Sequence, residues 1–235
     1  MPGAQGPRLP YSVVAGVAPT ELGWLVASAK LRGATFAPEE PRLFDSFREV
    51  LDGRPAFTII VVNVPIGSPD ESSPVQRTCD REARALLQGR VWAGVPSPWT
   101  YLPSTIDGDV GTRDGESDFF QARRDEVALE ISPSSQRVVY EGHPDLSFYQ
   151  LNGYEVPSWS HDDRDADDQR RAMLELKIPG VARVLDVEGL GVSPRELIDV
   201  AALMWTARRV FGHSAARLPS EGEWDARGLR MELVM

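Results

Sequence analysis

The first hydrophobic residues of the chain form two short runs rich in β-branched or small apolar side chains, residues 12–17 and 23–28. Short runs of this composition favour β-strands. Because only a few residues around Pro19 separate them, we predict that the two strands pair in an antiparallel hairpin. A weaker strand is expected at residues 34–37. A longer run, residues 57–64, is apolar at consecutive positions, which is typical of a central strand covered on both faces.

Apolar residues at helical spacing indicate most of the other elements. The last helix has the clearest signal: the Ser-Pro-Arg-Glu sequence at residues 193–196 is a capping box with proline at the first helical position, and apolar residues follow to Phe211. Together the elements predict an α/β fold with a mixed sheet. The remaining helices are expected at residues 41–51, 78–88, 119–129, 144–151 and 169–176, and short strands at 137–140 and 229–235.

We expect one folded domain over residues 11–235, preceded by a flexible N-terminus at residues 1–10. Two polar stretches rich in aspartate, near residues 103–118 and 158–168, are expected to be surface insertions.

The charge and cysteine content of the chain limit the kinds of partner and cofactor that we expect. The formal net charge is −10, with 35 acidic and 25 basic residues among 235. This balance repels a phosphodiester backbone at long range, which counts against nucleic acid. No apolar run approaches the ~18 residues of a membrane helix, so no membrane partner is expected. A single cysteine, Cys79, excludes an internal disulfide and a multi-cysteine zinc site, and the cytoplasm is the expected location.

Four polar residues are candidates for a site. Asn63 lies near the end of an apolar strand, and Glu141 and His143 follow another strand; ligands of α/β folds bind at the carboxyl ends of strands. Asp199 is the lone carboxylate in the apolar run at residues 197–207, which costs free energy unless it is paired or bound to a metal. Structural alternatives are a buried amide bonded to the next turn for Asn63, a turn residue for His143, and a buried ion pair with arginine for Asp199.

Several enzyme motifs are missing from the sequence: there is no nucleophile elbow, phosphate-binding glycine loop with lysine, His-Glu-x-x-His pair or dinucleotide fingerprint. Cys79 begins a predicted helix without a histidine nearby in sequence, so a small core residue is favoured. A local basic surface is conceivable from five arginines: Arg77, Arg81, Arg84, Arg123 and Arg124.

Several stretches of the chain resemble the domain-of-unknown-function 429 family, described as predicted nucleases of RNase H-like fold. They include residues 14–17, 64–67, 77–87, 141–153, 199–208 and 228–232. The resemblance implies a five-stranded mixed sheet that begins with a hairpin meander and has helices on both faces. It also implies carboxylates from the first strand, a central strand and a late helix, which bind two divalent cations, Mg²⁺ or Mn²⁺.

The sequence departs from that pattern at two positions. Ala18 stands where the family has an aspartate after the first apolar run, and Asn63 replaces the aspartate of Asp-x-Pro-Ile-Gly. The resemblance leaves Glu141 and Asp199 as candidate metal ligands, with Asp80 and Asp145 at other family positions whose role it does not define. Asn63 and His143 stay candidate site residues because of their places after strands.

Two main hypotheses follow. The first is a catalytically degenerate or repurposed member that binds a ligand or partner in its cleft, because both replacements remove charge from a site for divalent cations. The alternative is a divalent-metal-dependent nuclease or phosphodiester hydrolase with a rearranged site that uses Glu141, Asp199 and conceivably Glu21. A third is an enzyme of different chemistry on the same scaffold. The class of ligand, nucleic acid included, and the oligomeric state are left open.

Overall fold

The computed structural model describes residues 10–68, 77–87, 114–157 and 164–235. Nine of the ten residues expected to form a flexible N-terminus lie outside this range, as do residues 103–113 and 158–163 of the two polar stretches.

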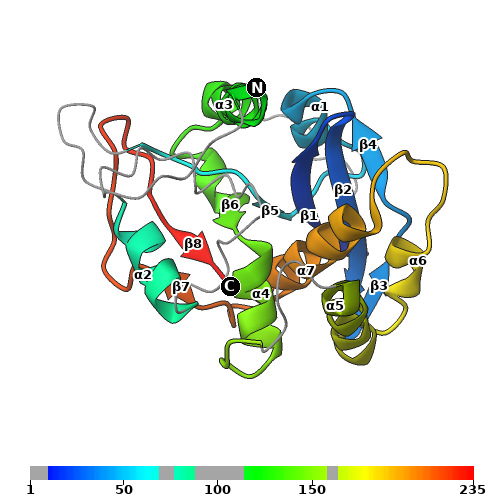
Figure 1. Cartoon of the computed structure of the whole chain (residues 1–235). Helices are drawn as coiled ribbons and strands as arrows, with labels where there is room; N and C mark the ends of the chain where they lie inside the picture. The colour runs from blue at the N-terminus through cyan, green and yellow to red at the C-terminus, as the bar shows by residue number, and fades with distance from the viewer. Residues whose placement is uncertain (1–9, 69–76, 88–113, 158–163) are drawn as a thin grey trace.

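The described strands form one mixed sheet in the order β3-β2-β1-β5-β6-β8-β7, with β4 paired to β2 (Figure 1). β1, β5, β6 and β8 run parallel to one another, whereas β2, β3, β4 and β7 are antiparallel to their neighbours. The predicted α/β class with a mixed sheet is confirmed. The strand number differs, because β4, β7 and β8 extend the five strands β3-β2-β1-β5-β6 to eight in the described residues. The bounds are β1 Ser12–Thr20, β2 Gly23–Arg32, β3 Thr35–Pro38, β4 Arg42–Phe44, β5 Ile59–Val62, β6 Val139–Gly142, β7 Arg217–Leu218 and β8 Leu233–Val234.

The predicted hairpin is present as β1 and β2, with a tighter turn than the sequence suggests. β1 continues through Ala18 to Thr20, which pairs with Gly23. Thr20 Oγ1 donates to Gly23 O at 3.1 Å, and Gly23 has a φ of +133°. A side-chain hydroxyl and a glycine therefore close this turn, and Ala18 lies within the strand.

The helix expected at residues 41–51 forms only in its second half. The first half is β4, in which Phe44 pairs with Trp24 of β2, and α1 spans Phe47–Leu51. Ser46 caps α1 by accepting a hydrogen bond from Glu49 N. The prediction was wrong here because pairing with β2 outweighs a local helical pattern.

The other helices largely match their predicted positions. The capping box of α7 is present, and α4 has the predicted bounds. α3 and α5 begin inside the stretches expected to be polar insertions, so residues 114–118 and 164–168 are helical. The bounds are α2 Thr78–Leu86, α3 Asp114–Glu130, α4 Pro144–Leu151, α5 Arg164–Lys177, α6 Ala182–Leu185 and α7 Pro194–Phe211; α6 was not predicted.

Helices cover both faces of the sheet (Figure 1). α4, α5, α6 and α7 pack on the side of Val14 and Val61, which we call the α7 face; α1 and α3 pack on the side of Val62, the α3 face. α7 lies directly on β1 at Gly16, where an added Cβ would be 2.3 Å from Met204 N. The helix can approach this closely because residue 16 has no side chain.

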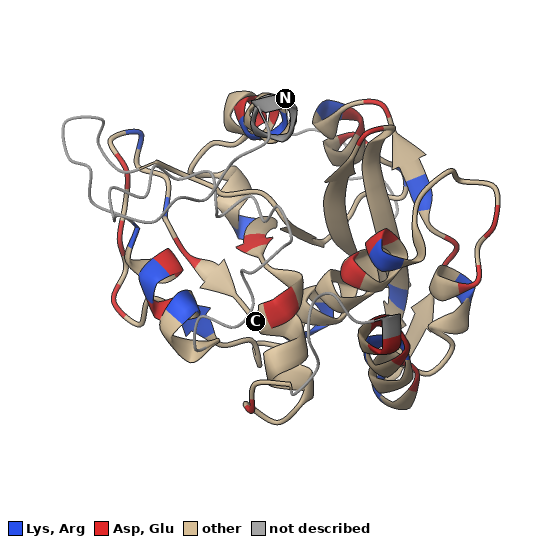
Figure 2. Ribbon diagram, viewed as in Figure 1, with Lys and Arg blue, Asp and Glu red and all other residues tan. Residues whose placement is uncertain are grey.

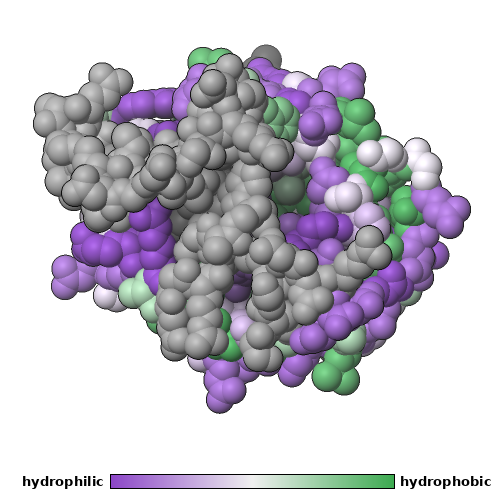
Figure 3. All heavy atoms as spheres, in the orientation of Figure 1, coloured by the Kyte–Doolittle hydropathy of each residue, from purple (hydrophilic) through white to green (hydrophobic). Residues whose placement is uncertain are grey.

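Acidic and basic positions are interspersed along α2, α5 and α7 (Figure 2). On the face drawn in Figure 3 the described hydrophobic residues form small separate areas within a mainly hydrophilic surface. Within the described residues, no helix combines the length and apolarity needed to cross a membrane.

Candidate functional site

Three positions of the expected site lie on neighbouring strands at one edge of the sheet. Ala18 is in β1, Asn63 directly follows β5, and Glu141 is in β6. Val62 is the register partner of both Val17 and Glu141. Asn63 N donates to Val17 O at 2.9 Å, which continues the ladder by one residue. The fold therefore places positions 18, 63 and 141 side by side at the carboxyl ends of parallel strands.

These positions do not share one face of the sheet. Ala18 is buried in the cluster beneath α7. Glu141 is in register with Val62, which belongs to the cluster on the α3 face, and register partners point to the same side. Asn63 comes one residue after Val62 and so lies toward the α7 face. Glu141 is thus separated by the sheet from the helix that carries Asp199.

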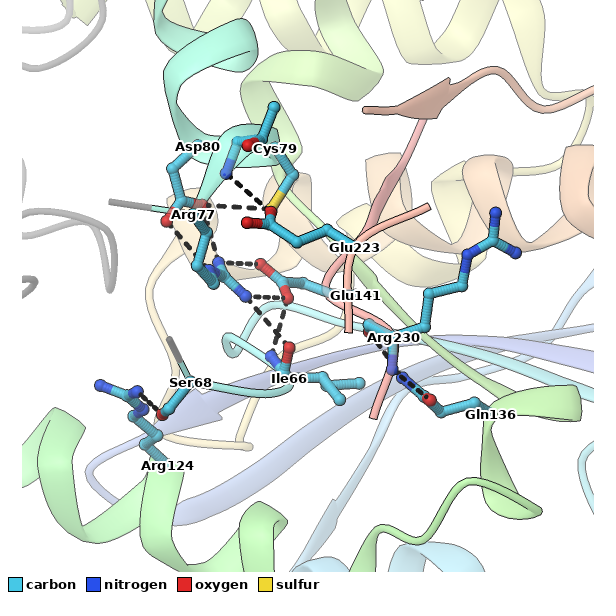
Figure 4. Close-up of polar contacts among 11 residues, drawn as sticks. Ile66, Ser68, Arg77, Cys79, Asp80, Arg124, Gln136, Glu141, Glu223 and Arg230 are labelled. Atoms are coloured by element: carbon cyan, nitrogen blue, oxygen red, sulfur yellow. Dashed lines mark hydrogen bonds and ion pairs between the residues drawn. The ribbon is translucent and has the colours of Figure 1, made fainter. Parts of the chain in front are cut away.

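Glu141 is bound by a buried arginine (Figure 4). Arg77 Nη1 donates to Glu141 Oε2 and Arg77 Nη2 to Glu141 Oε1, both at 2.7 Å. Ile66 N also donates to Oε2 at 2.7 Å. The same guanidinium donates to Asp80 through Nε at 2.9 Å and Nη2 at 2.7 Å, and to Ile66 O at 3.1 Å. We call Arg77, Asp80 and Glu141 the Arg77 cluster.

The start of α2 positions this cluster. Arg77 immediately precedes the helix and Asp80 lies in its first turn, three residues on, a spacing that places the two side chains together. The Arg77 side chain does not cap α2. Instead Glu223, from the C-terminal part of the chain, accepts a hydrogen bond from Thr78 N at 2.9 Å. The first turn is therefore tied to the sheet through Arg77 and to the C-terminal segment through Glu223.

The Arg77 cluster holds its charges in the interior: Arg77 and Asp80 are 0% exposed and Glu141 is 2% exposed. Burial acts to lower the pKa of Arg77, but the charges of Glu141 and Asp80 outweigh it and hold that pKa well above its ordinary value. Burial raises the pKa of Glu141, while the charge of Arg77 and its hydrogen bonds oppose the rise. The guanidinium stays protonated, and three N–H donors favour the ionised form of Glu141.

The Arg77 cluster does not fit a divalent cation. Both oxygens of Glu141 already accept guanidinium N–H groups, and a metal ion there would lie beside a protonated Arg77. Throughout the described ranges, no group of three or more His, Cys, Asp or Glu side chains is placed to hold a metal ion. The residues that the structure describes therefore do not form the two-metal site that the family resemblance implies.

Asp199 belongs to a different set of charges, between α5 and α7. Arg195 donates to Asp199 Oδ1 from Nε at 3.3 Å and to Asp167 Oδ1 from Nη1 at 2.7 Å. Arg170, which is 1% exposed, lies 3.4 Å from Asp167 and 3.5 Å from Asp145. Asp199 thus forms an ion pair with an arginine, as in the alternative to a site role, although both side chains are half-buried and not fully buried. A metal-binding role for it stays a prediction.

His143 and Asp145 lie at the start of α4. His143 Nδ1 accepts a hydrogen bond from Asp145 N at 3.2 Å and so caps the helix. The Asp145 carboxylate is 3.6 Å from the same nitrogen and also faces Arg170. This geometry corresponds to the turn-residue alternative for His143, and a catalytic role stays a prediction.

The side-chain oxygen of Asn63 is buried but does not make the contact expected from the sequence. This atom, Oδ1, has no hydrogen-bond partner among the described residues, so the expected bond to the following turn is not made there. A buried carbonyl oxygen left without a donor costs about 1–3 kcal/mol. An oxygen in this position can accept a hydrogen bond from a ligand or from a part of the chain outside the described residues.

Sequence reasoning missed the role of Arg77. It was considered as part of a basic surface, but the structure buries it against Glu141. Two other members of that group are also engaged: Arg123 pairs with Glu126 at 3.1 Å, and Arg124 donates to Ser68 Oγ, whereas Arg81 is exposed. A usable signal was present, since an arginine directly before a helix with an aspartate three residues later is suited to an ion pair.

Comparison with known proteins was made by sequence and by structure. No curated protein matches the chain significantly. A structure of RuvC from Thermus thermophilus aligns with 86% of this chain and 97% of its own, at 15% identity and a TM-score of 0.30, a value too low to support an argument. The model of the family described as "Protein of unknown function (DUF429)" matches residues 16–101 and 119–223. This match spans most of the chain and includes the positions of Ala18, Asn63, Arg77 and Glu141, so the protein belongs to the DUF429 family.

Proposed function

We propose that this protein keeps the fold of its family, lacks two-metal phosphodiester cleavage, and uses the carboxyl edge of its sheet to bind a ligand or partner. The observation that carries the proposal is the bidentate contact of Arg77 with Glu141. This contact occupies the carboxylate that would otherwise be available at the end of β6. Ala18 and Asn63 support the same conclusion, because neither supplies a negative charge.

The number of negative charges missing from the expected metal site favours ligand binding over metal-dependent cleavage. Two divalent cations bring four positive charges into one site, and the protein must compensate them with carboxylates. Here Ala18 and Asn63 leave two formal negative charges out, and the charge of Glu141 is already compensated by Arg77. Asn63 Oδ1 instead offers a buried neutral acceptor. A ligand that donates a hydrogen bond suits this edge better than a pair of metal ions.

A paired titration and cleavage experiment tests the proposal. We expect no saturable heat on titration of the wild-type protein with Mg²⁺ or Mn²⁺, and no cleavage of single- or double-stranded DNA or RNA. Metal-dependent cleavage by the wild type that is lost in Asp199→Ala would instead establish the nuclease with a rearranged site.

Restoring the carboxylates gives the matched comparison. Ala18→Asp combined with Asn63→Asp adds two negative charges at the edge, so weak Mn²⁺ binding should appear. Ala18→Asn is the control, since it adds a side chain of similar size without charge and should bind no Mn²⁺. If the double variant and the control behave alike, the loss of charge at positions 18 and 63 is not what removed metal binding.

A further inference from the structure

A second candidate binding site is a surface pocket lined by arginine and aromatic side chains. A pocket of about 400 Å³ is lined partly by residues that precede β6 and β8, and Ala18, Asn63 and Glu141 are not part of its lining. Arg137 precedes β6 and Glu232 precedes β8. We call it the arginine pocket. Three arginines, two aromatic residues and one glutamate in its lining determine its chemistry: Arg137, Arg217, Arg230, Tyr140, Trp224 and Glu232.

The arginine pocket is cationic on an acidic protein. Three arginines and one glutamate give it a formal charge of 3 − 1 = +2, whereas the whole chain carries −10. Glu232, with a side chain 9% exposed, pairs with Arg217 and, at 3.0 Å, with Arg230 Nε. Arg137 is exposed and forms no ion pair within the part of the chain that the structure describes. One carboxylate therefore fixes two guanidinium groups and leaves excess positive charge facing the pocket.

The backbone of the arginine pocket is held in place. Gln136 Nε2 donates to Arg230 O at 2.8 Å, and Gln136 Oε1 accepts from Arg230 N at 2.8 Å (Figure 4). Arg230 also forms an isolated antiparallel bridge with Trp224. The segment that carries both side chains is thus fixed before any ligand arrives, which lowers the entropy cost of binding.

Aromatic rings accompany the arginines. The guanidinium of Arg217 lies 5.2 Å from the centre of the Tyr140 ring, and that of Arg230 lies 5.9 Å from the Trp224 ring. Trp224 is 60% exposed. Its indole packs against Gly222, where an added Cβ would be 2.4 Å from the ring. The pocket therefore presents a positioned, solvent-accessible indole next to guanidinium groups.

We propose that the arginine pocket binds a nucleoside monophosphate, with the phosphate on the arginines and the base against Trp224. The planar guanidinium fork matches phosphate oxygens, and an exposed indole offers a face for base stacking. A volume of about 400 Å³ is within the range of small-molecule sites. Outside the pocket the chain carries −10 − 2 = −12, which repels a long polyanion, so a single nucleotide is favoured over a nucleic-acid strand. This site does not depend on the function proposed for the carboxyl edge.

Calorimetric titration with adenosine 5′-monophosphate at low ionic strength tests the proposal, with adenosine and inorganic phosphate as separate arms. We expect one saturable site for the monophosphate and at least about tenfold weaker binding of either part alone. Arg137→Gln and Trp224→Ala should each weaken binding about tenfold. Gly222→Ala should also weaken it, because it displaces the indole without removing any group that contacts the ligand.

Matched controls come from exposed residues elsewhere. Arg183→Gln and Tyr154→Ala remove an exposed arginine and an exposed aromatic ring outside the pocket and should leave the affinity unchanged. Circular dichroism checks that each variant is folded. The proposal fails if no saturable binding is seen up to millimolar monophosphate, or if Arg137→Gln or Trp224→Ala binds as well as the controls. It also fails if inorganic phosphate or adenosine binds as tightly as the monophosphate.

Discussion

Arg77 is the residue whose replacement tests the structure most directly. Arg77→Met removes the cation that Asp80 and Glu141 share while keeping much of the apolar volume. Both carboxylates are then buried without their partner, and breaking a buried pair in this way costs about 3–5 kcal/mol. Because a domain has about 5–15 kcal/mol of stability in total, we expect a variant that is marginally folded or unfolded at 25 °C. Arg77→Lys keeps the charge but loses the guanidinium fork and should cost about 2 kcal/mol.

The stability of these variants should also depend on pH in a defined direction. Burial already raises the pKa of Glu141, and Arg77 is the main influence that opposes the rise. Without Arg77 the folded-state pKa rises further above that of the unfolded chain, so folding takes up a proton. Stability must then increase as the pH falls, by up to about 1.4 kcal/mol per pH unit for one proton. Compared with the wild type, Arg77→Met should gain stability between pH 8 and pH 5.

Urea unfolding followed by circular dichroism at several pH values measures both effects. Arg81→Met is the matched control, because Arg81 is an exposed arginine on the same helix and should change stability by less than about 0.5 kcal/mol. Combining Arg77→Met with Glu141→Gln should cost less than the sum of the single changes, since the two side chains are in direct contact. Additive costs, or an Arg77→Met variant as stable as the control at every pH, would refute the buried ion-pair assignment.

Two substitutions and one reactivity measurement test other parts of the fold. Gly16→Ala places a Cβ 2.3 Å from Met204 N and should cost about 3 kcal/mol or more in urea unfolding, whereas a tolerated change would mean that α7 does not lie on β1 in this way. Ser193→Ala removes the side chain that accepts from Glu196 N and should cost about 1 kcal/mol by the same assay; no loss would argue against the capping box. Burial raises the pKa of the Cys79 thiol, so the folded protein should react with Ellman's reagent far more slowly than the protein in urea, and equal rates would show that Cys79 is accessible.

Local signals were enough to predict most of the elements. Two elements were placed correctly because their signals lie in adjacent residues: the capping box at Ser193, which begins α7, and the apolar run that contains β5. The stretch before Phe47 was not, because its first residues pair with Trp24 of β2 instead of forming a helical turn. Such pairing is decided by a strand elsewhere in the chain, which no local pattern shows.

The candidate site was harder to predict because its chemistry depends on long-range partners. Arg77 and Glu141 are 64 residues apart, and sequence alone gave no reason to join them. The sequence also did not show to which face of the sheet each side chain points. The strand order places Asn63 and Glu141 on neighbouring strands, but side chains alternate along β6, so Glu141 points away from α7. The sequence therefore located the edge of the sheet correctly but did not show how its charges are arranged.

Both carboxylates of the Arg77 cluster already have a counter-charge within the protein. Asp80 and Glu141 share Arg77, and Arg124, which donates to Ser68 beside this edge, brings a second guanidinium group. Two further carboxylates lie here, because Glu223 accepts from Thr78 N and Asp225 from Ser68 N. Burial, and then the charge of Arg77, lowers the pKa of Arg124, as expected for two guanidinium groups close together. A divalent cation bound to Glu141 would lie next to the protonated Arg77, where the low dielectric of the interior makes repulsion strong. Because Arg77 supplies the counter-charge of the Asp80 and Glu141 carboxylates, we expect no metal ion on the α3 side of the edge, and we propose that a ligand on the opposite side is recognised by Asn63 and its neighbours through hydrogen bonds and shape.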